Sequence, residues 1–543
     1  MGICGRKDSE SDIASQPENV GVCVKQEARR IVKAGPKGEN RFMAKNDLAV
    51  VVLAAGKGTR LKSNVAKVLH RAGGRTLVEH VVHACQGTGA RRICIVVGYQ
   101  ADEVTAIVTP LGAKTVLQQP QRGTGHALLV ARRAIGSARY VLVLPGDAPL
   151  VRAETLKALM RAHVESGAAA TLLTALLSDP TGYGRIVRQG NDPASGRVAA
   201  IIEQSQLAEN QREINEVNSS IYCFTLAKLW PVMARLRPNN AHRELYLTDA
   251  IAPLAAAGEP VMALVASDAA EILGCNTRAE LAEVDRTFRR RAAESLMNSG
   301  VSIQFPETVV IDAGVTAGPD SFIGANVQLL GRTRIGANCT IGAGSILTDM
   351  TLAEGVLVKP YSILNASQVA AGAQIGPFSH LREDVVLREN ARIGNFVEAK
   401  KTVLGRRAKA MHLSYLGDAR IGDETNIGAG TITCNYDGVH KNATTIGRGV
   451  FIGSDTALVA PVRVGDGAYV AAGSVISENV PADALGIARG RQTNKPGWAR
   501  ARRREMAKSK KPAKKNRARG KKRVAKKRAT KKRAAKKSRR RRR

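Results

Sequence analysis

The sequence predicts an α/β domain, followed by a parallel β-helix of hexapeptide repeats and then by a basic, disordered C-terminal tail. Three observations lead to this division: apolar runs that alternate with helix-like segments in the first half, a six-residue repeat in the second half, and a charge-dense end. A chain of 543 residues, 44% apolar and 24% charged, can form several folded domains, which excludes a disulfide-stapled miniprotein.

Composition and cysteine usage predict a cytoplasmic protein without a membrane span. No uninterrupted apolar run approaches the roughly 18 to 20 residues that span a bilayer, and the N-terminal region lacks the apolar core of a signal peptide. The eight cysteines are spread over the chain without a C-x-x-C pair, which fits reduced thiols better than disulfides or a metal site. Of the net charge of +37, residues 500–543 supply +26, from 27 Lys and Arg against one acid.

Residues 1–46 mix both charges with Gly, Ser and Pro and show no apolar period, so we expect a disordered extension. The start is not a myristoylation signal, because Arg6 stands where Ser or Thr is needed. Met43 lies just before the first apolar run and is as good a candidate for the start as Met1.

Residues 47–276 have the alternation that is typical of an α/β layer. The apolar runs are 48–55, 93–97 and 140–144, and helix-like segments include 76–84 and 125–134. Continuous apolar runs that end in Gly-rich turns are typical of buried parallel strands. Such a layer binds its ligand at the carboxyl ends of the strands. Residues 277–299 then predict a long charged linker helix, with Asn276 as its N-cap.

Residues 300–490 follow a repeat of six in which an aliphatic residue usually precedes Gly or Ala. Tandem pairs in one phase occupy residues 335–346, 369–380, 421–432, 446–457 and 464–475. The aliphatic side chains can fill a triangular coil whose corners need small residues, so the hexapeptides stack into a β-helix with coils of about 18 residues and roughly ten coils. A flexible Gly-rich linker would not place Ile and Val so regularly. Residues 433–445 interrupt the repeat and must loop out of the wall.

A nucleotide site is expected where the first strand runs into a glycine-rich turn. Gly56 and Gly58 let backbone N–H groups approach a phosphate, while Arg60 and Lys67 can neutralise the charge of a departing pyrophosphate. The spacing fits neither the P-loop nor G-x-G-x-x-G, which disfavours ordinary ATPases and dehydrogenases. Asp147 ends another apolar strand and is a natural Mg²⁺ ligand.

Several segments together resemble the sugar nucleotidyltransferases: LAAGKGTR, Lys67, QRGTGHA, GDAPL, GYGR and EVN. With NFVEAKK, HLSYLGD and TCNYDG in the repeat region, residues 47–498 resemble the bacterial bifunctional N-acetylglucosamine-1-phosphate uridyltransferase and glucosamine-1-phosphate N-acetyltransferase family. The resemblance implies an α/β nucleotidyltransferase (Rossmann-like) domain and a left-handed parallel β-helix. It also implies synthesis of UDP-N-acetylglucosamine, a precursor of peptidoglycan and lipopolysaccharide.

For the first domain, the resemblance implies a UTP and UDP-sugar site with one Mg²⁺. The uridine pocket would be Leu53, Ala54, Ala55, Gly56, Gln118, Gly123 and Thr124; the triphosphate would lie on Arg60 and Lys67; the metal ligands would be Asp147 and Asn276; and the sugar would contact Gly184, Glu203 and Asn218. The sugar phosphate attacks the α-phosphorus of UTP in line, which needs positioning and charge neutralisation and no general base.

For the β-helix, the residues themselves suggest an acyl-transfer site. Arg382 and Lys400 are 18 residues apart, one coil, so the two cations can stack to hold a phosphate. His412 titrates in the range needed to take the proton of an attacking amine. His380 and Glu383 depart from the Arg and Pro that members of the resembled family often carry beside Arg382.

The resemblance adds further roles on the β-helix and an assembly. Glu398 would orient the base or the amine, and Tyr415, Asn426 and Asn435 would lie at the sugar phosphate. Acetyl-CoA would contact Asn435, Tyr436, Ser454, Ala472 and Arg489, with the backbone at Tyr436 stabilising the oxyanion. β-Helices of this kind close as homotrimers with the acyl-CoA cleft between subunits.

The tail, residues 491–543, is expected to be disordered and able to bind nucleic acid or another polyanion through counterion release. A solvated tail without a role is an equal alternative. Two other functions stay open: a single-activity sugar-1-phosphate nucleotidyltransferase and a polyanion-binding protein. His412, Tyr415 and the NYDG segment argue against the first, and the paired phosphate sites argue against the second.

Overall fold

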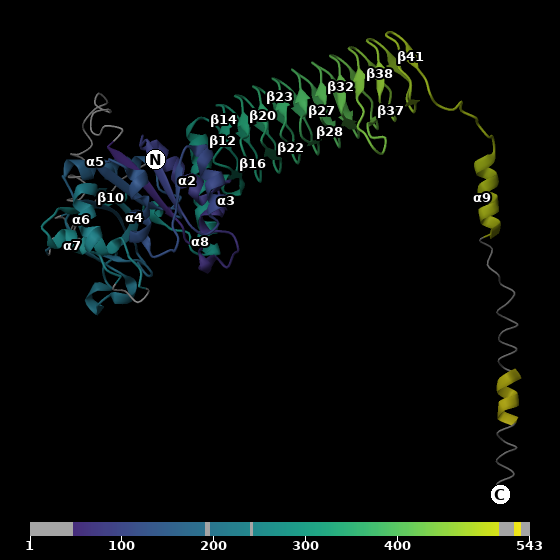
Figure 1. Ribbon diagram of the computed structural model, residues 1–543. Coiled ribbons are helices and arrows are strands. Elements are labelled where there is room, and N and C mark those ends of the chain that lie inside the picture. Colours follow the sequence, from purple (N-terminus) through teal and green to yellow (C-terminus); the bar gives the residue numbers. More distant parts are fainter. Residues whose placement is uncertain (1–46, 191–195, 239–242, 510–525, 534–543) are drawn as a thin grey trace, which may run out of the picture.

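The computed structural model describes residues 47–190, 196–238, 243–509 and 526–533. An α/β domain forms one end of the molecule, a rod of stacked strands extends from it, and the tail leaves the far end of the rod (Figure 1). The disorder expected for residues 1–46 lies outside the described residues. Among the described residues, no helix is both long and apolar enough to cross a membrane.

The α/β domain is built on a mixed sheet in the order β11-β7-β10-β6-β1-β4-β5, to which β8 and β9 attach through β10. The strands are β1 (Leu48–Ala54), β4 (Arg92–Val97), β5 (Lys114–Leu117), β6 (Tyr140–Pro145), β7 (Ala170–Leu176), β8 (Arg185–Arg188), β9 (Val198–Ile202), β10 (Glu216–Thr225) and β11 (Val261–Val265). Strands β6, β1, β4 and β5 are parallel, as expected, whereas β10 runs antiparallel between β6 and β7.

Helices cover both faces of this sheet, because its central strands are apolar on both sides. In β1, Val50 and Val52 belong to one core, and Ala49 and Val51 to the other. The first core packs against α2 (Leu77–Gly87), α3 (Ala101–Val108) and α5 (Ala153–Glu165), and the second against α4 (Thr124–Ile135), α6 (Leu226–Arg235) and α7 (Ile251–Ala256). The predicted apolar runs and helix-like segments of the first domain are thus confirmed.

The linker helix α8 spans Arg278–Asn298. Its N-cap is Thr277, whose side chain accepts a hydrogen bond from the Glu280 amide at 3.2 Å, so the expected cap at Asn276 is wrong. The physical reason is that the Asn276 side-chain oxygen is engaged by Arg60 and Lys67 instead.

The second half is a parallel β-helix with three sheets of 11, 10 and 9 strands, running from β12 (Ser302–Ile303) to β41 (Leu485–Gly486). Successive coils place Ile323, Ile341, Val358 and Ile375 one above another in its interior. Some coils have 18 residues and others 17: Phe322 pairs with Thr340, and Thr340 pairs with Leu357. The hexapeptide prediction is therefore confirmed.

One corner of the β-helix carries apolar side chains outward. Tyr361, Phe378, Phe396 and Leu413 occupy successive coils with positive φ and are each at least half exposed. The first three rings stack at centroid distances of 5.4 and 5.6 Å. We call these four residues the corner stripe. Bulky residues are uncommon in the left-handed region of φ, so this backbone conformation is imposed by the turn of each coil. The same turn directs the four side chains outward.

The interruption of the repeat loops out between β34 (Ile432–Cys434) and β35 (Thr444–Ile446), as predicted. Two described parts of the tail are helical: Trp498–Ser509 form helix α9, and residues 526–533 form a second helix. The rest of the predicted disordered tail after residue 509 lies outside the described residues. Ala, Arg and Lys are strong helix formers, and Arg502 pairs with Glu505 at 3.2 Å. Every residue of α9 is exposed.

Candidate functional sites

The candidate nucleotide site lies at the carboxyl edge of the parallel strands. Leu53 in β1 is in register with Val96 of β4 and with Pro145 of β6, and β5 ends beside β4. The segments that follow these strands carry Ala55, Gln118 and Asp147. The structure thus brings three segments of the predicted site to one edge, where a ligand of such a sheet binds.

The residues predicted to form the uridine pocket are held by backbone and amide contacts. The Ala55 carbonyl accepts hydrogen bonds from the Tyr99 amide at 3.1 Å and from Gln121 Nε2 at 2.7 Å. The buried Gln118 donates through Nε2 to the Gly123 carbonyl at 3.0 Å. Gly123 has φ 95°, and a Cβ there would lie 2.6 Å from the Leu245 carbonyl oxygen, so this position requires glycine.

Thr124 has a structural partner in this region. Its hydroxyl oxygen accepts a hydrogen bond from the Leu247 amide at 3.0 Å. Together with the approach of Gly123 to Leu245, this contact fixes the start of α4 against the segment that carries Leu245 and Leu247. Gln121, which bonds Ala55, lies inside the QRGTGHA segment but was not among the predicted residues.

The residues predicted to hold the triphosphate and the metal meet in one cluster. Lys67 Nζ forms an ion pair with Asp147 and lies 2.7 Å from Asn276 Oδ1, to which Arg60 Nη2 also donates at 2.9 Å. The Lys67 and Asp147 side chains are 16% and 19% exposed. The prediction that these four side chains act together is therefore consistent with their placement.

The donors of this cluster fit Mg²⁺. Asp147 and Asn276 offer oxygens to the same cationic group, and Mg²⁺ favours oxygen ligands, taking one or two from protein carboxylates or amides and the rest from phosphates and water. Within the described residues, no group of three or more His, Cys, Asp or Glu could hold a metal. A metal at this edge would thus share its coordination with the substrate.

Asn276 is held by the start of the linker helix. The Cys275 amide donates to the Asp147 carbonyl at 3.1 Å, and the Asn276 amide donates to Glu280 Oε2 at 2.5 Å. Sequence reasoning missed Glu280, although Thr277 followed three residues later by Glu is the spacing of a helix start.

The three predicted sugar residues come from three segments and meet at Gly184. The Asn218 amide donates to the Gly184 carbonyl at 2.9 Å, and a Cβ at Gly184 would lie 3.6 Å from Glu203 Oε2. The Asn218 side chain is buried against the Tyr222 hydroxyl at 2.8 Å. Burial, and then the charge of Asp249, raises the pKa of Glu203.

Tyr183 lies next to one of the predicted sugar residues, within electrostatic range of Asp147. Burial raises the pKa of its hydroxyl, and the charges of Glu280 and Asp147 raise it further. Tyr183 directly precedes Gly184 in the GYGR segment. It was quoted in the motif but given no role by sequence reasoning.

On the β-helix, Arg382 and Lys400 stack as predicted. Leu381 pairs with Ala399, so Arg382 and Lys400, which follow them in the sequence, occupy matching positions on adjacent coils. Both cations are engaged by carboxylates: Lys400 Nζ lies 2.8 Å from Glu383 Oε1, and Arg382 Nη1 lies 3.2 Å from Glu398 Oε1. Glu383 also approaches Arg382 Nε at 4.0 Å. In this structure Glu398 thus orients Arg382 rather than His412.

His412 is oriented by Asn395, which sequence reasoning missed. The two residues pair between β30 (Lys409–His412) and β27 (Arg392–Asn395), and His412 Nδ1 lies 2.8 Å from Asn395 Oδ1. Because the amide oxygen accepts, the ring proton lies on Nδ1 and the Nε2 lone pair is open to a substrate. The exposed ring suits a general base.

Tyr415 and Asn435 meet beside Lys400. Both side chains approach Gly417 closely, since a Cβ on this glycine would lie 2.5 Å from Tyr415 Oη and 2.7 Å from Asn435 Nδ2. Gly417 in turn pairs with Lys400 on the preceding coil. Asn435 is buried and donates to Asp418 at 2.5 Å. Tyr436, by contrast, is exposed on the loop, where its hydroxyl donates to the Gly438 carbonyl.

Two of the predicted acetyl-CoA residues, Ser454 and Ala472, lie on the same corner as His412. The strand registers place His412, Ala429, Ser454 and Ala472 on successive coils. Arg489 Nη1 donates to the Ala472 carbonyl at 2.8 Å.

Asn426 is separated from this corner, because it pairs with Lys409 at the other end of the His412 strand. That separation is about 10 Å along the strand. A single chain therefore does not bring Asn426 to the residues around Lys400.

Comparisons with known proteins match both halves of the chain. Family models match as a MobA-like NTP transferase domain over residues 50–275, a GMPPB C-terminal domain over 305–404 and six bacterial transferase hexapeptide repeats over 443–478. Three curated relatives carry the name "Bifunctional protein GlmU". That of Koribacter versatilis is 49% identical, covering 85% of this chain and 98% of its own. That of Anaeromyxobacter sp. strain Fw109-5 is 50% identical, covering 85% and 94%, and that of Corynebacterium diphtheriae is 45% identical, covering 83% and 93%.

Proposed function

The chain belongs to the family of bifunctional GlmU proteins, whose two activities synthesise UDP-N-acetylglucosamine, and we propose how its residues divide these two reactions. The assignment is supported by where two groups lie. A cluster of oxygen donors and cations lies at the strand edge of the α/β domain, and a histidine oriented by a hydrogen bond lies on the β-helix. These are the chemical needs of phosphoryl transfer and of amine acylation.

In the proposed uridylyl transfer, residues 47–276 bind UTP and N-acetylglucosamine-1-phosphate. Gly184, Glu203 and Asn218 hold the sugar so that its phosphate oxygen faces the α-phosphorus of UTP. Lys67 and Arg60 then leave Asn276 for the phosphates and stabilise the departing pyrophosphate. Mg²⁺, bound by Asp147 and Asn276, would neutralise phosphate charge.

In the proposed acetyl transfer, residues 300–490 bind glucosamine-1-phosphate with its phosphate on Arg382 and Lys400. His412 Nε2 takes a proton from the amine as its nitrogen attacks the thioester carbonyl. The C–N bond forms, the C–S bond breaks and coenzyme A leaves as its thiol. The backbone at Tyr436 donates to the oxyanion.

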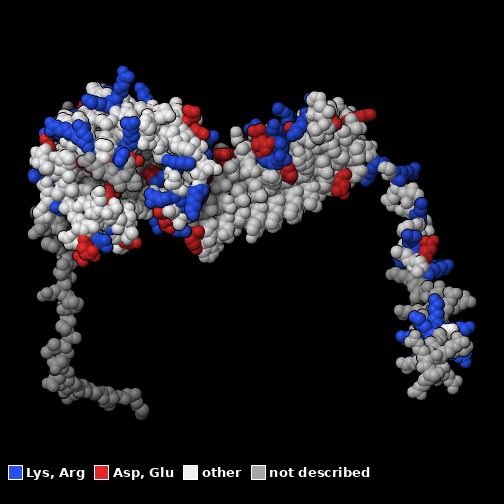
Figure 2. Space-filling model, turned by 60° about the horizontal axis from the view of Figure 1, so that its bottom comes forward, with Lys and Arg blue, Asp and Glu red and all other residues white. Residues whose placement is uncertain are grey.

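We propose that the β-helix works as a homotrimer. The support is the exposed corner stripe, the large uncharged surface of the rod in the view of Figure 2, and the separation of Asn426 from Lys400 within one chain. A neighbouring copy could supply the missing half of the sugar site, because heterologous contacts between β-helices can close a three-fold ring.

The protein is placed in the cytoplasm by this proposal, because the described cysteines are free thiols and the substrates are UTP and acetyl-CoA. The tail supports a second candidate activity, non-specific binding of nucleic acid. Lys and Arg crowd α9 and the helix at residues 526–533 (Figure 2), and α9 has no buried residue that would tie it to the rod.

A single reaction tests the main proposal. The full chain is incubated with glucosamine-1-phosphate, acetyl-CoA, UTP and Mg²⁺, and the sugar products are identified by mass spectrometry. N-acetylglucosamine-1-phosphate should form without UTP, and UDP-N-acetylglucosamine only when UTP is added. UDP-glucosamine as the main product would contradict the order of the two steps.

A further inference from the structure

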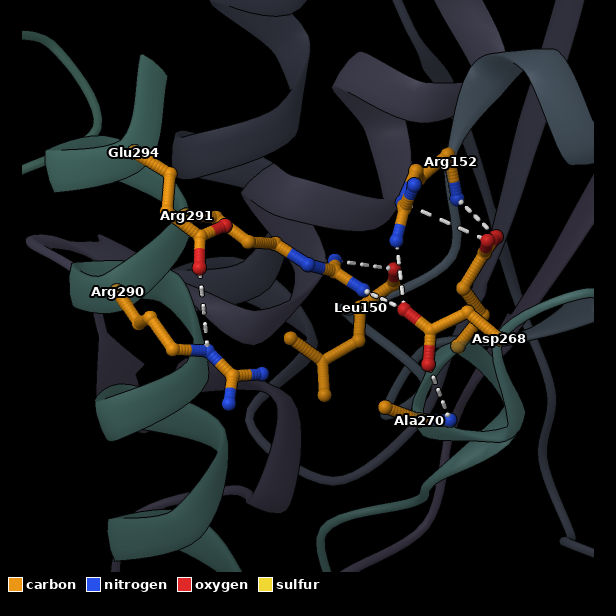
Figure 3. A network of polar contacts seen from close by, with 8 residues as sticks. Leu150, Arg152, Asp268, Ala270, Arg290, Arg291 and Glu294 are labelled. Carbon is orange, nitrogen blue, oxygen red and sulfur yellow. Dashed lines mark hydrogen bonds and ion pairs between the residues drawn. The ribbon is translucent and has the colours of Figure 1, made fainter. Parts of the chain in front are cut away.

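The linker helix α8 contacts both segments that carry the proposed metal donors (Figure 3). Arg291 Nη1 donates to the Leu150 carbonyl at 2.9 Å, and Arg291 Nη2 donates to Asp268 Oδ2 at 3.0 Å. Leu150 lies three residues after Asp147, and Asp268 lies eight residues before Asn276. One side chain thus joins the two segments.

Arg152 reinforces this junction from the first segment. Its Nη2 donates to Asp268 Oδ2 at 2.6 Å, and its amide donates to Glu271 Oε2 at 3.0 Å. The Glu271 side chain is 1% exposed, so this carboxylate depends on its protein partners. The contacts run between residues more than 100 positions apart and define the spacing of the two segments.

Asp268 is the centre of the network and is held ionised. Burial acts to raise its pKa, but the Ala270 amide and Arg291 together lower the pKa below its ordinary value. Arg291 is itself only 23% exposed, and hydrogen bonds between ionised groups are stronger than neutral ones.

The next residue along the helix offers a matched comparison. Arg290 faces solvent with a 66% exposed side chain, and its Nε lies 3.9 Å from Glu294 Oε1. Exposed helical ion pairs of this kind contribute little. Arg290 and Arg291 thus have the same chemistry on the same helix, and only Arg291 touches the segments of the metal site.

We propose that Arg291 is a positioning residue for uridylyl transfer, which sets the distance between the segments of Asp147 and Asn276 by binding Leu150 and Asp268. The inference rests on the proposed metal role of Asp147 and Asn276. Groups that hydrogen-bond a metal ligand directly change metal affinity or activity by about 10- to 100-fold when removed. Arg291 acts one step further out, through the segments that carry the ligands, so we expect an effect of about 3- to 10-fold. The linker helix therefore helps to set the geometry of the first active site.

The test uses the full-length variants Arg291→Gln, Arg291→Lys, Asp268→Asn and the control Arg290→Gln. Mn²⁺ binding is measured by electron paramagnetic resonance in the presence of UDP-N-acetylglucosamine, and both activities are measured in parallel. Arg291→Gln should weaken Mn²⁺ binding and raise the half-saturating Mg²⁺ concentration about 3- to 10-fold. Acetyl transfer should stay unchanged. Arg291→Lys keeps the charge and one contact, so it should fall between the wild type and Arg291→Gln, and Arg290→Gln should match the wild type.

Unchanged Mn²⁺ affinity in folded Arg291→Gln would overturn the proposal, as would an equal loss in Arg290→Gln. A parallel loss of both activities would show a purely structural role. If Arg291→Gln does not fold, Arg291→Lys and Asp268→Asn decide by the same readouts. Asp147→Asn tests the proposed metal site independently of Arg291. If this variant binds Mn²⁺ normally, the assignment of the metal site is wrong, and the result does not bear on the contacts that Arg291 makes with Leu150 and Asp268.

Discussion

Nδ1 of His412 lies 2.8 Å from Oδ1 of Asn395, directly beneath it on the preceding coil. This contact assigns the two ring nitrogens different tasks, since Nδ1 is committed to the protein and Nε2 is left for the substrate. It also means that the stacking of coils, rather than a loop, holds the proposed base in place.

His412→Ala should reduce acetyl transfer by about two to four orders of magnitude, the usual worth of a general base, and leave uridylyl transfer unchanged. Steady-state assays of each half-reaction measure this. Asn395→Ala should cause a smaller loss and change the pH profile of acetyl transfer, because the ring loses its fixed tautomer. A His412 variant with near-normal acetylation would remove this residue from the mechanism.

Asp147→Asn should abolish UDP-sugar formation and leave acetyl transfer intact, since only the first site uses this carboxylate. The two half-reactions are assayed separately on the same preparation. The control is Asp268→Asn, which leaves Asp147 itself in place and should weaken the reaction without abolishing it. An equal loss of both activities in a folded Asp147→Asn variant would contradict the two-site assignment.

Glu383→Gln should lower the KM for glucosamine-1-phosphate about two- to five-fold with little change in kcat, because the carboxylate competes with the substrate phosphate for Lys400 and Arg382. The Lys400 contact lowers the pKa of Glu383 to about 2. A carboxyl with a lowered pKa stays ionised until the pH falls toward that value, so the KM difference should be constant between about pH 5 and 9. A higher KM in Glu383→Gln would show instead that Glu383 helps to bind the substrate.

His163 should make the α/β domain less stable in mild acid. Burial lowers its pKa to about 4, and its ring lies 2.9 Å from the Thr171 hydroxyl and 3.0 Å from the Thr225 hydroxyl. Between about pH 6.5 and 4, His163 therefore binds a proton in the unfolded chain but not in the folded chain. The free energy of unfolding should fall by about 3 kcal/mol as the pH is lowered through that range. Urea unfolding followed through Trp230 fluorescence measures this, and His163→Gln should lose this part of the slope. An identical slope in the variant would assign the acid sensitivity to other groups.

Truncation after Trp498 should leave both activities within a few fold and remove most of the affinity for DNA or RNA, since +26 of the net charge of +37 lies beyond that residue. Labelled duplexes of unrelated sequence are titrated at several salt concentrations, and the affinity of the full chain should fall steeply with salt. Salt-insensitive or sequence-selective binding would contradict the polyelectrolyte interpretation. Loss of acetyl transfer would mean that the tail contributes to the acyl-CoA cleft.

Sequence patterns predicted the repeating β-helix, but they could not predict the non-covalent contacts between residues that are far apart in the sequence. The stacking of Arg382 on Lys400 follows from an 18-residue coil. Asn395 lies 17 residues before His412, because coils of both lengths occur, so a fixed period misses this pair. The contact of Lys67 with Asn276 spans 209 residues, and no local period encodes it. Lys67 was predicted from its charge near the glycine-rich turn, the metal role of Asn276 was predicted only through the resemblance, and Arg291 was not predicted at all.

The rod between the two ends of the molecule also acts as a spacer. At the usual separation of neighbouring strands, the eleven-stranded sheet from β12 to β41 extends over about 48 Å. The tail leaves this sheet at the end opposite the α/β domain (Figure 1). The point where the tail leaves the rod is thus several Debye lengths from Lys67 and Arg60 at physiological ionic strength. Cations at the base of the tail therefore exert little direct electrostatic influence on the proposed UTP site.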